Sequence, residues 1–265
     1  MGGLCKNLYI PSSQDELIDL VSSDDKEYLF IGGGSNLLID DKGVFDNVVL
    51  LREFDDSIVN MGDGEFLVGA SVRLQRLIRE INSRGYGGIE YLFSVPALTG
   101  GAVYMNAGRG RTENKCISDY IIEVKALHNG KVVYLSKDEC CFSYRHSVFK
   151  DGGYLILSVK FKFKEGSKEQ FDAAVKERLD HCKLHQDASK PNFGTVFSLA
   201  DNRVMRIAAK LDQGKNKGVY FSHKTRNWLI NENGTFKQAV SRLKLVQFLH
   251  KVLGKSCNAE VIIWK

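Results

Sequence analysis

Proline is scarce in this chain, with three residues in a total of 265. A stiff proline-rich linker is therefore absent, and domain boundaries must be inferred from other patterns. No apolar run approaches the roughly 20 residues that span a bilayer. The N-terminus also lacks the basic region and the apolar stretch of a secretory signal peptide. We expect a cytoplasmic protein that does not bind a membrane.

Cysteine occurs six times, but the positions are scattered, and Cys140 and Cys141 are adjacent. This spacing suits neither a zinc site nor a dense disulfide framework. His181 and His185 lie four residues apart, but no cluster of acids stands beside them, so a solvated helix face is favoured over a metal pair. We therefore expect reduced thiols and no metal site.

An excess of one charge is nearly absent, because 37 basic residues stand against 32 acidic residues and give a net charge of +5. The surplus is spread along the chain, and no basic tract is interleaved with aromatic residues. This pattern argues against nucleic acid as a partner and fits a small anionic ligand. The hydrophobic content of 43% is ordinary for a globular protein of one to three compact units.

Glycine is abundant in one short stretch, Gly32-Gly33-Gly34, which Ser35 and Asn36 follow. Successive residues without a Cβ let their backbone N–H groups converge on one point, as in a nest for a phosphate. The alternative is a glycine-rich hairpin turn. The apolar run that begins at Leu37 is strand-like, so this is not a Rossmann fingerprint, which requires a helix there.

A second glycine-rich segment extends from Pro96 to Gly108. Thr99, Gly100 and Gly101 could approach a phosphate through backbone donors, and Asn106 could bond to a ring edge. Alone, this segment would be a plain loop. Together with the first segment, it favours a pyrophosphate that is held from two sides.

Three further residues could carry chemistry, each with a simpler alternative. Arg145 lies among aromatic residues, where a fixed guanidinium could bind a carboxylate or a developing enolate, or could merely pack on Tyr144. Glu260 is either the solvated first residue of a strand or an acid facing a pocket. Thr195 follows a glycine turn and either donates a proton or simply begins a strand.

Hydrophobic periodicity predicts the main elements of secondary structure. Helices are expected at residues 12–21, 72–81, 167–185 and 235–253. Strands are expected at residues 8–10, 27–31, 37–39, 48–51, 58–61, 65–68, 120–127, 131–135, 154–163, 228–230 and 259–264. The turns at residues 62–64 and 129–130 predict two hairpins.

Three blocks of the chain, in order, resemble the UDP-N-acetylenolpyruvoylglucosamine reductase (MurB) family. These blocks are residues 32–38, 88–108 and 144–149. The turn at residues 194–197 and the closing Glu260-Val261 fall where that family has its proton donor and its C-terminal acid. The length of the chain favours the compact, type II-like branch of the family.

The resemblance implies an α+β (α/β) fold, with a two-part FAD-binding module of the MurB / vanillyl-alcohol-oxidase type and a small C-terminal α+β substrate domain. The expected domains are 1–55 and 56–188 for FAD and 189–254 for the substrate, with a strand in 255–265 returning to the second. It also implies a monomeric enzyme of peptidoglycan precursor synthesis. A hydride from NADPH would pass through flavin N5 to the enolpyruvyl group of a UDP-sugar, giving UDP-N-acetylmuramate.

Carried onto this sequence, the resemblance assigns Arg145 and Glu260 to the stabilisation of an enolic intermediate. It assigns Thr195, where the family has a serine, to proton donation. The residues assigned to the substrate are Tyr144, Arg226 and Asn227. The residues assigned to FAD are Gly32, Gly33, Gly34, Ser35, Asn36, Leu37, Val95, Pro96, Thr99, Gly100, Gly101 and Asn106.

The chain departs from the family pattern mainly in the expected substrate domain. Thr195 replaces a serine, Ile262 replaces the arginine of a Glu-Val-Arg sequence, and residues 94–97 replace Gly-Ile-Pro-Gly. Two alternatives therefore stay open. One is a flavin oxidoreductase on the same scaffold with a different substrate, and the other is a non-catalytic protein that binds flavin or a nucleotide sugar.

Overall fold

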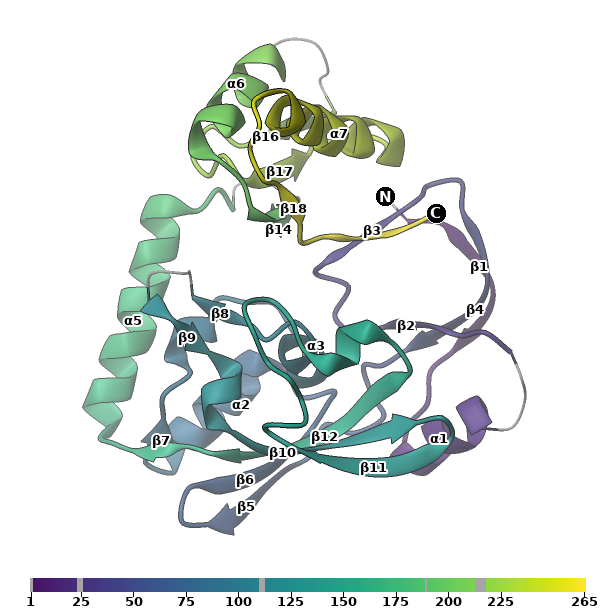
Figure 1. Cartoon of the computed structure of the whole chain (residues 1–265). Coiled ribbons are helices and arrows are strands. Elements are labelled where there is room, and N and C mark those ends of the chain that lie inside the picture. The colour runs from purple at the N-terminus through teal and green to yellow at the C-terminus, as the bar shows by residue number, and fades with distance from the viewer. Residues whose placement is uncertain (1, 23–25, 110–112, 189, 213–217) are drawn as a thin grey trace. The chain divides into compact units, whose positions relative to one another are not determined.

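The computed structural model describes residues 2–22, 26–109, 113–188, 190–212 and 218–265 (Figure 1). The fold mixes helices and strands in the α+β manner that was predicted. Residues 2–6, 34–45 and the described part of 181–265 form one compact unit, here called unit 1. Residues 7–33 and 46–180, as far as they are described, form unit 2. The three-domain division expected from the sequence stays a prediction.

Unit 2 is built on a five-stranded antiparallel sheet in the order β11-β10-β12-β6-β5. Its strands are β5 (Ile58–Gly62), β6 (Glu65–Gly69), β10 (Ile121–His128), β11 (Lys131–Ser136) and β12 (Tyr154–Lys162). Both predicted hairpins, β5–β6 and β10–β11, are confirmed. In the second, Asn129 and Gly130 both have positive φ, as a two-residue type I′ turn requires.

Two helices of unit 2 bury apolar faces in its core. Helix α2 (Leu74–Ser83) buries the four side chains that the helical spacing predicts, namely Leu74, Leu77, Ile78 and Ile81. Helix α3 (Thr99–Tyr104) lies in the second glycine-rich segment, where the sequence predicted no helix. Glycine disfavours helices, but burial of Ala102 and Val103 against β6 and β12 outweighs that local preference.

Other elements flank the sheet of unit 2, and some of them include residues of unit 1. Helix α1 (Gln14–Ser22) begins two residues after the start of its predicted range. Strands β1 (Leu4–Tyr9), β4 (Val44–Leu50) and β2 (Leu29–Ile31) form a sheet in the order β1-β4-β2, in which β2 and β4 are parallel. Two short pairs are β7 (Tyr86–Gly87) with β13 (Lys164–Glu165) and β8 (Gly108–Arg109) with β9 (Lys115–Cys116). Turns of 3₁₀ helix occupy Glu90–Leu92, Ile117–Tyr120 and Val148–Asp151. Strands β1 and β4 and helix α5 (Lys168–His185) include residues of both units.

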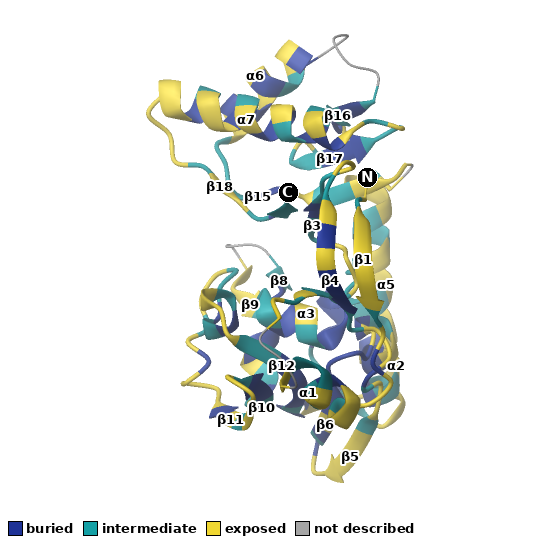
Figure 2. Ribbon diagram, turned by 90° about the vertical axis from the view of Figure 1, so that its right-hand side faces the viewer, coloured by how far each residue is buried: buried dark blue, intermediate teal, exposed yellow. Residues whose placement is uncertain are grey.

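Unit 1 carries an antiparallel sheet in the order β14-β17-β16. Its strands are β14 (Asn192–Thr195), β16 (Val219–Phe221) and β17 (Trp228–Asn231). Helices α6 (Asn202–Asp212) and α7 (Phe236–Val252) pack on each other and on β16. Helix α7 has both buried and exposed faces (Figure 2), as expected of a helix that covers a core. Within the described ranges, no helix is long and apolar enough to cross a membrane.

The C-terminal segment differs from its prediction in two ways. It forms two short strands instead of one, because β18 (Asn258–Ala259) pairs with β15 (Phe197–Leu199) while β19 (Ile262–Trp264) pairs in parallel with β3 (Leu37–Ile39). We expected this segment to return to residues 56–188, and its pairing with β3 corrects that expectation. The reason is burial, because Leu38 and Val261 join the same apolar core of unit 1.

Candidate active site

The first glycine segment connects two strands that belong to different sheets. Strand β2 pairs with β4 and strand β3 pairs with β19, so the hairpin alternative is excluded. Gly32 and Gly33 are the last residues of this segment that belong to unit 2. A Cβ on Gly33 would stand 3.4 Å from the carbonyl oxygen of Pro96, and one on Gly32 would stand 3.8 Å from Leu98. The two glycine-rich segments therefore meet within unit 2, as predicted.

The rest of the first segment, from Gly34 to Leu37, belongs to unit 1. Gly34 has a φ of +71°, a conformation that favours glycine, and the side chain of Ser35 is exposed. Asn36 Nδ2 donates to the carbonyl of Glu260 at 3.1 Å, and the N–H of Ile262 donates to the carbonyl of Asn36 at 3.0 Å. Asn36 thus ties the glycine segment to the C-terminal acid.

The second glycine segment already uses several of its own donors. The N–H and the Oγ1 of Thr99 both donate to the carbonyl of Val72, at 2.7 and 2.9 Å, and Thr99 is fully buried. The N–H of Gly100 donates to the carbonyl of Ala70, and a Cβ on Gly100 would stand 2.8 Å from that of Ala70. A Cβ on Gly101, by contrast, would meet no atom within 4 Å. Gly101 is therefore the position at which the backbone leaves room for a ligand.

The residues just before α3 link this segment to α2. The carbonyl of Val95 accepts from Gln75 Nε2 at 2.8 Å, and the N–H of Leu74 donates to the carbonyl of Ala97. Pro96 is exposed. The residues before α3 are thus hydrogen-bonded to α2, whereas Pro96 between them is accessible to solvent.

Arg145 lies in a tight turn of unit 2. The backbone groups of Ser143 and His146 exchange two hydrogen bonds of 3.1 Å, and Arg145 between them has a φ of +57°. Its Nη2 donates to the carbonyl of Gly108 at 3.0 Å, and its guanidinium stacks over the ring of Tyr144 at 5.7 Å. The packing on Tyr144 that was one alternative from the sequence is present, and this stacking helps to fix the guanidinium plane. The binding of a carboxylate or an enolate by Arg145 stays a prediction.

Asn106, which was predicted to bond to a cofactor ring edge, is hydrogen-bonded to protein backbone in this structure. Its side chain is 3% exposed, and its Nδ2 donates to the carbonyl of Ser143 at 2.8 Å. Its Oδ1 accepts from the N–H of Ser118 at 3.4 Å. The amide therefore bonds on both sides to protein backbone, next to the turn that carries Arg145.

Thr195, Glu260 and Asn227 gather in unit 1. The N–H of Glu260 donates to the carbonyl of Val196 at 2.8 Å, and Thr195 is exposed at the end of β14. Asn227 Oδ1 accepts from the N–H of Phe197 at 3.1 Å, and its Nδ2 donates to the carbonyl of Phe197 at 2.7 Å. Asn227, which we expected to bind substrate, thus holds the strand that follows Thr195. Arg226 beside it is exposed.

Ser222 gave no sequence signal, yet it organises the loop that contains Arg226. Its hydroxyl is fully buried, donates to Asp187 Oδ2 at 2.7 Å, and accepts from the N–H groups of Lys224 and Thr225. A side chain with this many bonds fixes the path of residues 222–225.

A second group in unit 1 also went unpredicted. Tyr220 donates to Glu232 Oε1 at 2.5 Å, and Lys190 forms an ion pair with the same oxygen. The hydrogen bond to Glu232 raises the pKa of Tyr220 to about 12, and Lys190 with Tyr220 lowers the pKa of Glu232. At neutral pH, Glu232 is therefore ionised and Tyr220 is neutral.

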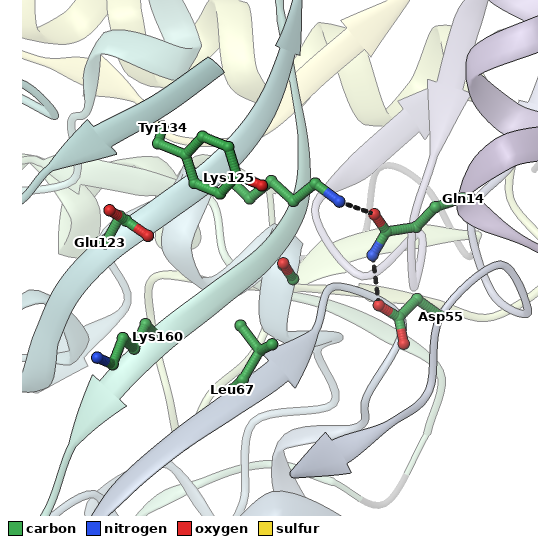
Figure 3. Close-up of a pocket in the computed structure, with 8 residues that line it drawn as sticks. Gln14, Asp55, Leu67, Glu123, Lys125, Tyr134 and Lys160 are labelled. Atoms are coloured by element: carbon green, nitrogen blue, oxygen red, sulfur yellow. Dashed lines mark hydrogen bonds between the residues drawn. The ribbon is translucent and has the colours of Figure 1, made fainter. Parts of the chain in front are cut away.

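A polar pocket of about 160 Å³ in unit 2 involves none of the predicted site residues (Figure 3). It lies on the polar face of β10 and β12, the face opposite to buried Val159. Lys125 Nζ donates to Gln14 Oε1 at 2.7 Å, and Gln14 Nε2 donates to Asp55 Oδ2 at 2.6 Å. These bonds join α1 to the sheet and give the pocket wall a structural role.

The residues present fit the FAD that the resemblance implies. Unit 2 brings two glycine-rich segments together, and at Gly101 it leaves room for a group to approach the backbone. Backbone N–H groups with no side chain in front of them suit a pyrophosphate. In the same unit, a fixed guanidinium at Arg145 is suited to stabilise a carboxylate or a developing enolate.

Comparisons with known proteins agree with this geometry. Residues 6–136 match the family model described as an FAD binding domain. A Leptospira interrogans protein named UDP-N-acetylenolpyruvoylglucosamine reductase is 34% identical, with 87% of this chain and 76% of that protein covered. Its namesake in Fusobacterium nucleatum is 31% identical, with 99% of this chain and 94% of that protein covered. The crystal structure of UDP-N-acetylenolpyruvylglucosamine reductase (MurB) from Thermus caldophilus matches with a TM-score of 0.76 at 26% identity, covering 97% of this chain and 92% of that one.

Proposed function

The chain belongs to the UDP-N-acetylenolpyruvoylglucosamine reductase (MurB) family, and from this membership we propose that it is an FAD-dependent reductase of peptidoglycan precursor synthesis. NADPH is the reductant, UDP-N-acetylglucosamine enolpyruvate is the substrate, and UDP-N-acetylmuramate is the product. The observation that carries the proposal is that the likeness to enzymes of this name extends over nearly the whole chain, beyond the residues matched by the FAD-binding model.

The chain holds FAD mainly through backbone groups. Gly32 and Gly33 face the segment from Pro96 to Leu98, and a Cβ on Gly101 would meet no atom within 4 Å. We assign the pyrophosphate to these glycines, with Gly34, Ser35, Asn36 and Leu37 extending the contact. Bound FAD supplies hydride transfer, since it takes a hydride from NADPH and gives it to the substrate.

Arg145 acts on the charge that develops in the substrate. When a hydride adds to one carbon of the enolpyruvyl double bond, the electron pair of that bond moves toward the neighbouring carboxylate as an enolate. A guanidinium held by Gly108 and Tyr144 can donate two parallel hydrogen bonds to that carboxylate without reorganising. Stabilisation of the enolate lowers the barrier to hydride addition.

Thr195 completes the reaction by giving a proton to the second carbon of the former double bond. Its hydroxyl replaces the serine of the family and keeps an O–H that can be transferred. Glu260, which the bond to Val196 holds next to this turn, assists in stabilising the enolic intermediate. The added methyl group of threonine restricts χ1, so the hydroxyl is held in fewer orientations than in serine.

Tyr144, Arg226 and Asn227 are the proposed contacts of the UDP-sugar outside the reacting atoms. Arg226 is exposed and cationic, which suits a phosphate. Asn227 contributes by fixing the strand after Thr195. We place the reaction in the cytoplasm, where NADPH and UDP-sugars are available, and we propose that the enzyme is a monomer.

The test follows the colour of the purified protein in an anaerobic stopped-flow instrument. The protein should be yellow, NADPH should bleach its flavin absorbance, and UDP-N-acetylglucosamine enolpyruvate should restore the absorbance with formation of UDP-N-acetylmuramate. A bleached protein that other acceptors reoxidise, but this substrate does not, would reject the substrate. A colourless protein that takes up no FAD would reject the whole proposal.

A further inference from the structure

Two neighbouring residues of unit 2 have backbone conformations that are rare outside glycine. Asn106 has a φ of +42° and Arg145 has a φ of +57°. Asparagine tolerates the left-handed region better than most residues, whereas arginine gains nothing there. A strained residue keeps such a conformation only where its surroundings fix it. The question is therefore what fixes the turn at Arg145.

The turn itself supplies only its own closing bonds. Ser143 and His146 exchange two backbone hydrogen bonds of 3.1 Å around Tyr144 and Arg145. Contacts from outside the turn must hold it to the rest of unit 2, and one of them is Lys150 Nζ, which donates to the carbonyl of Arg145 at 2.9 Å. The position of the guanidinium depends on these contacts, because the orientation of a side chain follows its backbone.

Asn106 anchors this turn to the segment that follows α3. Its Nδ2 donates to the carbonyl of Ser143 at 2.8 Å, the same carbonyl that accepts from His146. Because Asn106 is 3% exposed and its Oδ1 accepts from Ser118, its amide has one orientation in which both bonds form. The side-chain amide of Asn106 is thus fixed through both its donor and its acceptor.

The same segment also holds the far end of Arg145. Gly108, two residues beyond Asn106, accepts from Arg145 Nη2 at 3.0 Å. One short stretch of chain therefore fixes both the backbone and the guanidinium of the arginine. This double attachment defines where the guanidinium lies in unit 2.

We propose that Asn106 is a positioning residue for Arg145 and that its side chain is not a ligand of FAD. The inference rests on the proposed function in one respect, the assignment of Arg145 to the enolate. Likeness to the family does not distinguish a ligand of FAD from a residue that positions Arg145, but kinetics do. A ligand of FAD affects both the reduction of the flavin and its reoxidation. A residue that positions Arg145 affects only the transfer from the reduced flavin to the substrate.

Asn106→Asp is the most selective variant. It preserves the shape, the tolerance of positive φ and the acceptor for Ser118, but it places an acceptor against the carbonyl of Ser143. We expect the rate of flavin reoxidation by the enolpyruvyl substrate to fall about 10- to 100-fold, since displacement of a catalytic group by about 1 Å has that effect. FAD content and the rate of flavin reduction by NADPH should match those of the unmodified protein.

Asn129→Asp is the matched control. Asn129 has a φ of +49° in the exposed hairpin between β10 and β11, so the same chemical change is made at the same kind of backbone position. It should leave both half-reactions unchanged. Asn106→Gly serves as a second variant if the first does not fold, because glycine removes the anchor while relieving the positive φ.

Hydrogen exchange supplies a measurement that does not depend on activity. The amide of His146 closes the turn, so Asn106→Asp should speed its exchange, and Asn129→Asp should not. Equal loss in both half-reactions, or loss of FAD, would overturn the proposal in favour of a cofactor ligand. Unchanged reoxidation, or unchanged exchange at His146, would also overturn it. If the unmodified protein is not reoxidised by the substrate, the proposed function fails, and the exchange experiment alone decides whether Asn106 fixes the turn.

Discussion

The backbone N–H of Glu260 donates to the carbonyl of Val196 at 2.8 Å, although the two residues lie far apart in the sequence. This bond places the C-terminal acid next to the turn that ends at Thr195. The carbonyl of Glu260 in turn accepts from Asn36, a residue 224 positions earlier in the chain. Three segments of unit 1 that carry proposed site residues are therefore held together by a main-chain bond and by a bond from the side chain of Asn36. Substitution of the side chains of Thr195 and Glu260 leaves both bonds in place.

The hydroxyl of Thr195 can be tested because its removal need not alter these bonds. Thr195→Val keeps the branched shape and deletes the O–H, whereas Thr195→Ser keeps the O–H. We expect Thr195→Val to slow flavin reoxidation by the substrate about 10²- to 10⁴-fold, the usual contribution of a general acid. Thr195→Ser should retain activity, and NADPH should reduce all three proteins at the same rate. If Thr195→Val is reoxidised as fast as the unmodified protein, Thr195 is not the proton donor.

Gly100 and Gly101 are adjacent but should respond oppositely to alanine. A Cβ on Gly101 meets no atom within 4 Å, so Gly101→Ala should raise the unfolding free energy of the FAD-free protein by about 0.5–1 kcal/mol. It should also weaken FAD binding, measured by fluorescence titration. Gly100→Ala would press on Ala70 at 2.8 Å and should lower that free energy by about 1–3 kcal/mol. Unchanged FAD affinity in Gly101→Ala would remove Gly101 from the cofactor site.

Asn227 bridges both backbone groups of Phe197, at 3.1 and 2.7 Å. Asn227→Asp keeps the acceptor but removes the donor, which leaves the carbonyl of Phe197 facing a carboxylate. We expect the unfolding free energy in urea to fall by about 1–3 kcal/mol, the cost of a buried polar group without its partner. Asn233→Asp, at an exposed turn residue, is the control and should have little effect. Equal stability of the two variants would show that Asn227 does not support this strand.

The features that the sequence predicted well are those encoded by neighbours in the chain. The spacing of Leu74, Leu77, Ile78 and Ile81 indicated α2, and Asn129-Gly130 indicated a hairpin, because both depend on local geometry. The three glycines from Gly32 to Gly34 indicated an open backbone for the same reason. Motifs of this kind were sufficient to identify the family.

Features that depend on distant partners could not be predicted in this way. Helix α3 forms against the local preference of Gly100 and Gly101, since burial of its other residues in the core of unit 2 stabilises it. The pairing of β19 with β3 joins opposite ends of the chain. The backbone partners of Asn106 and Asn227 could not be predicted either, because an asparagine near a motif gives no sign of which distant main-chain groups its amide will meet.

The ion pair between Asp212 and Arg242 joins the end of α6 to α7, and its side chains are 3% and 9% exposed, with 2.5 Å between Oδ1 and Nε. Burial raises the pKa of Asp212, and Arg242 opposes that rise, so the carboxylate depends on this partner. Asp212→Asn should therefore lower the unfolding free energy by about 3–5 kcal/mol, because a buried guanidinium loses its counter-charge.

Asp172→Asn, which breaks an exposed pair with Lys168 on α5, is the control and should change the unfolding free energy by less than about 1 kcal/mol. The double variant Asp212→Leu/Arg242→Met should recover most of the loss in the same urea titration, since two apolar side chains leave no charge unpaired. A double variant as unstable as Asp212→Asn would mean that the lost packing at this position, and not the unpaired charge, causes the instability.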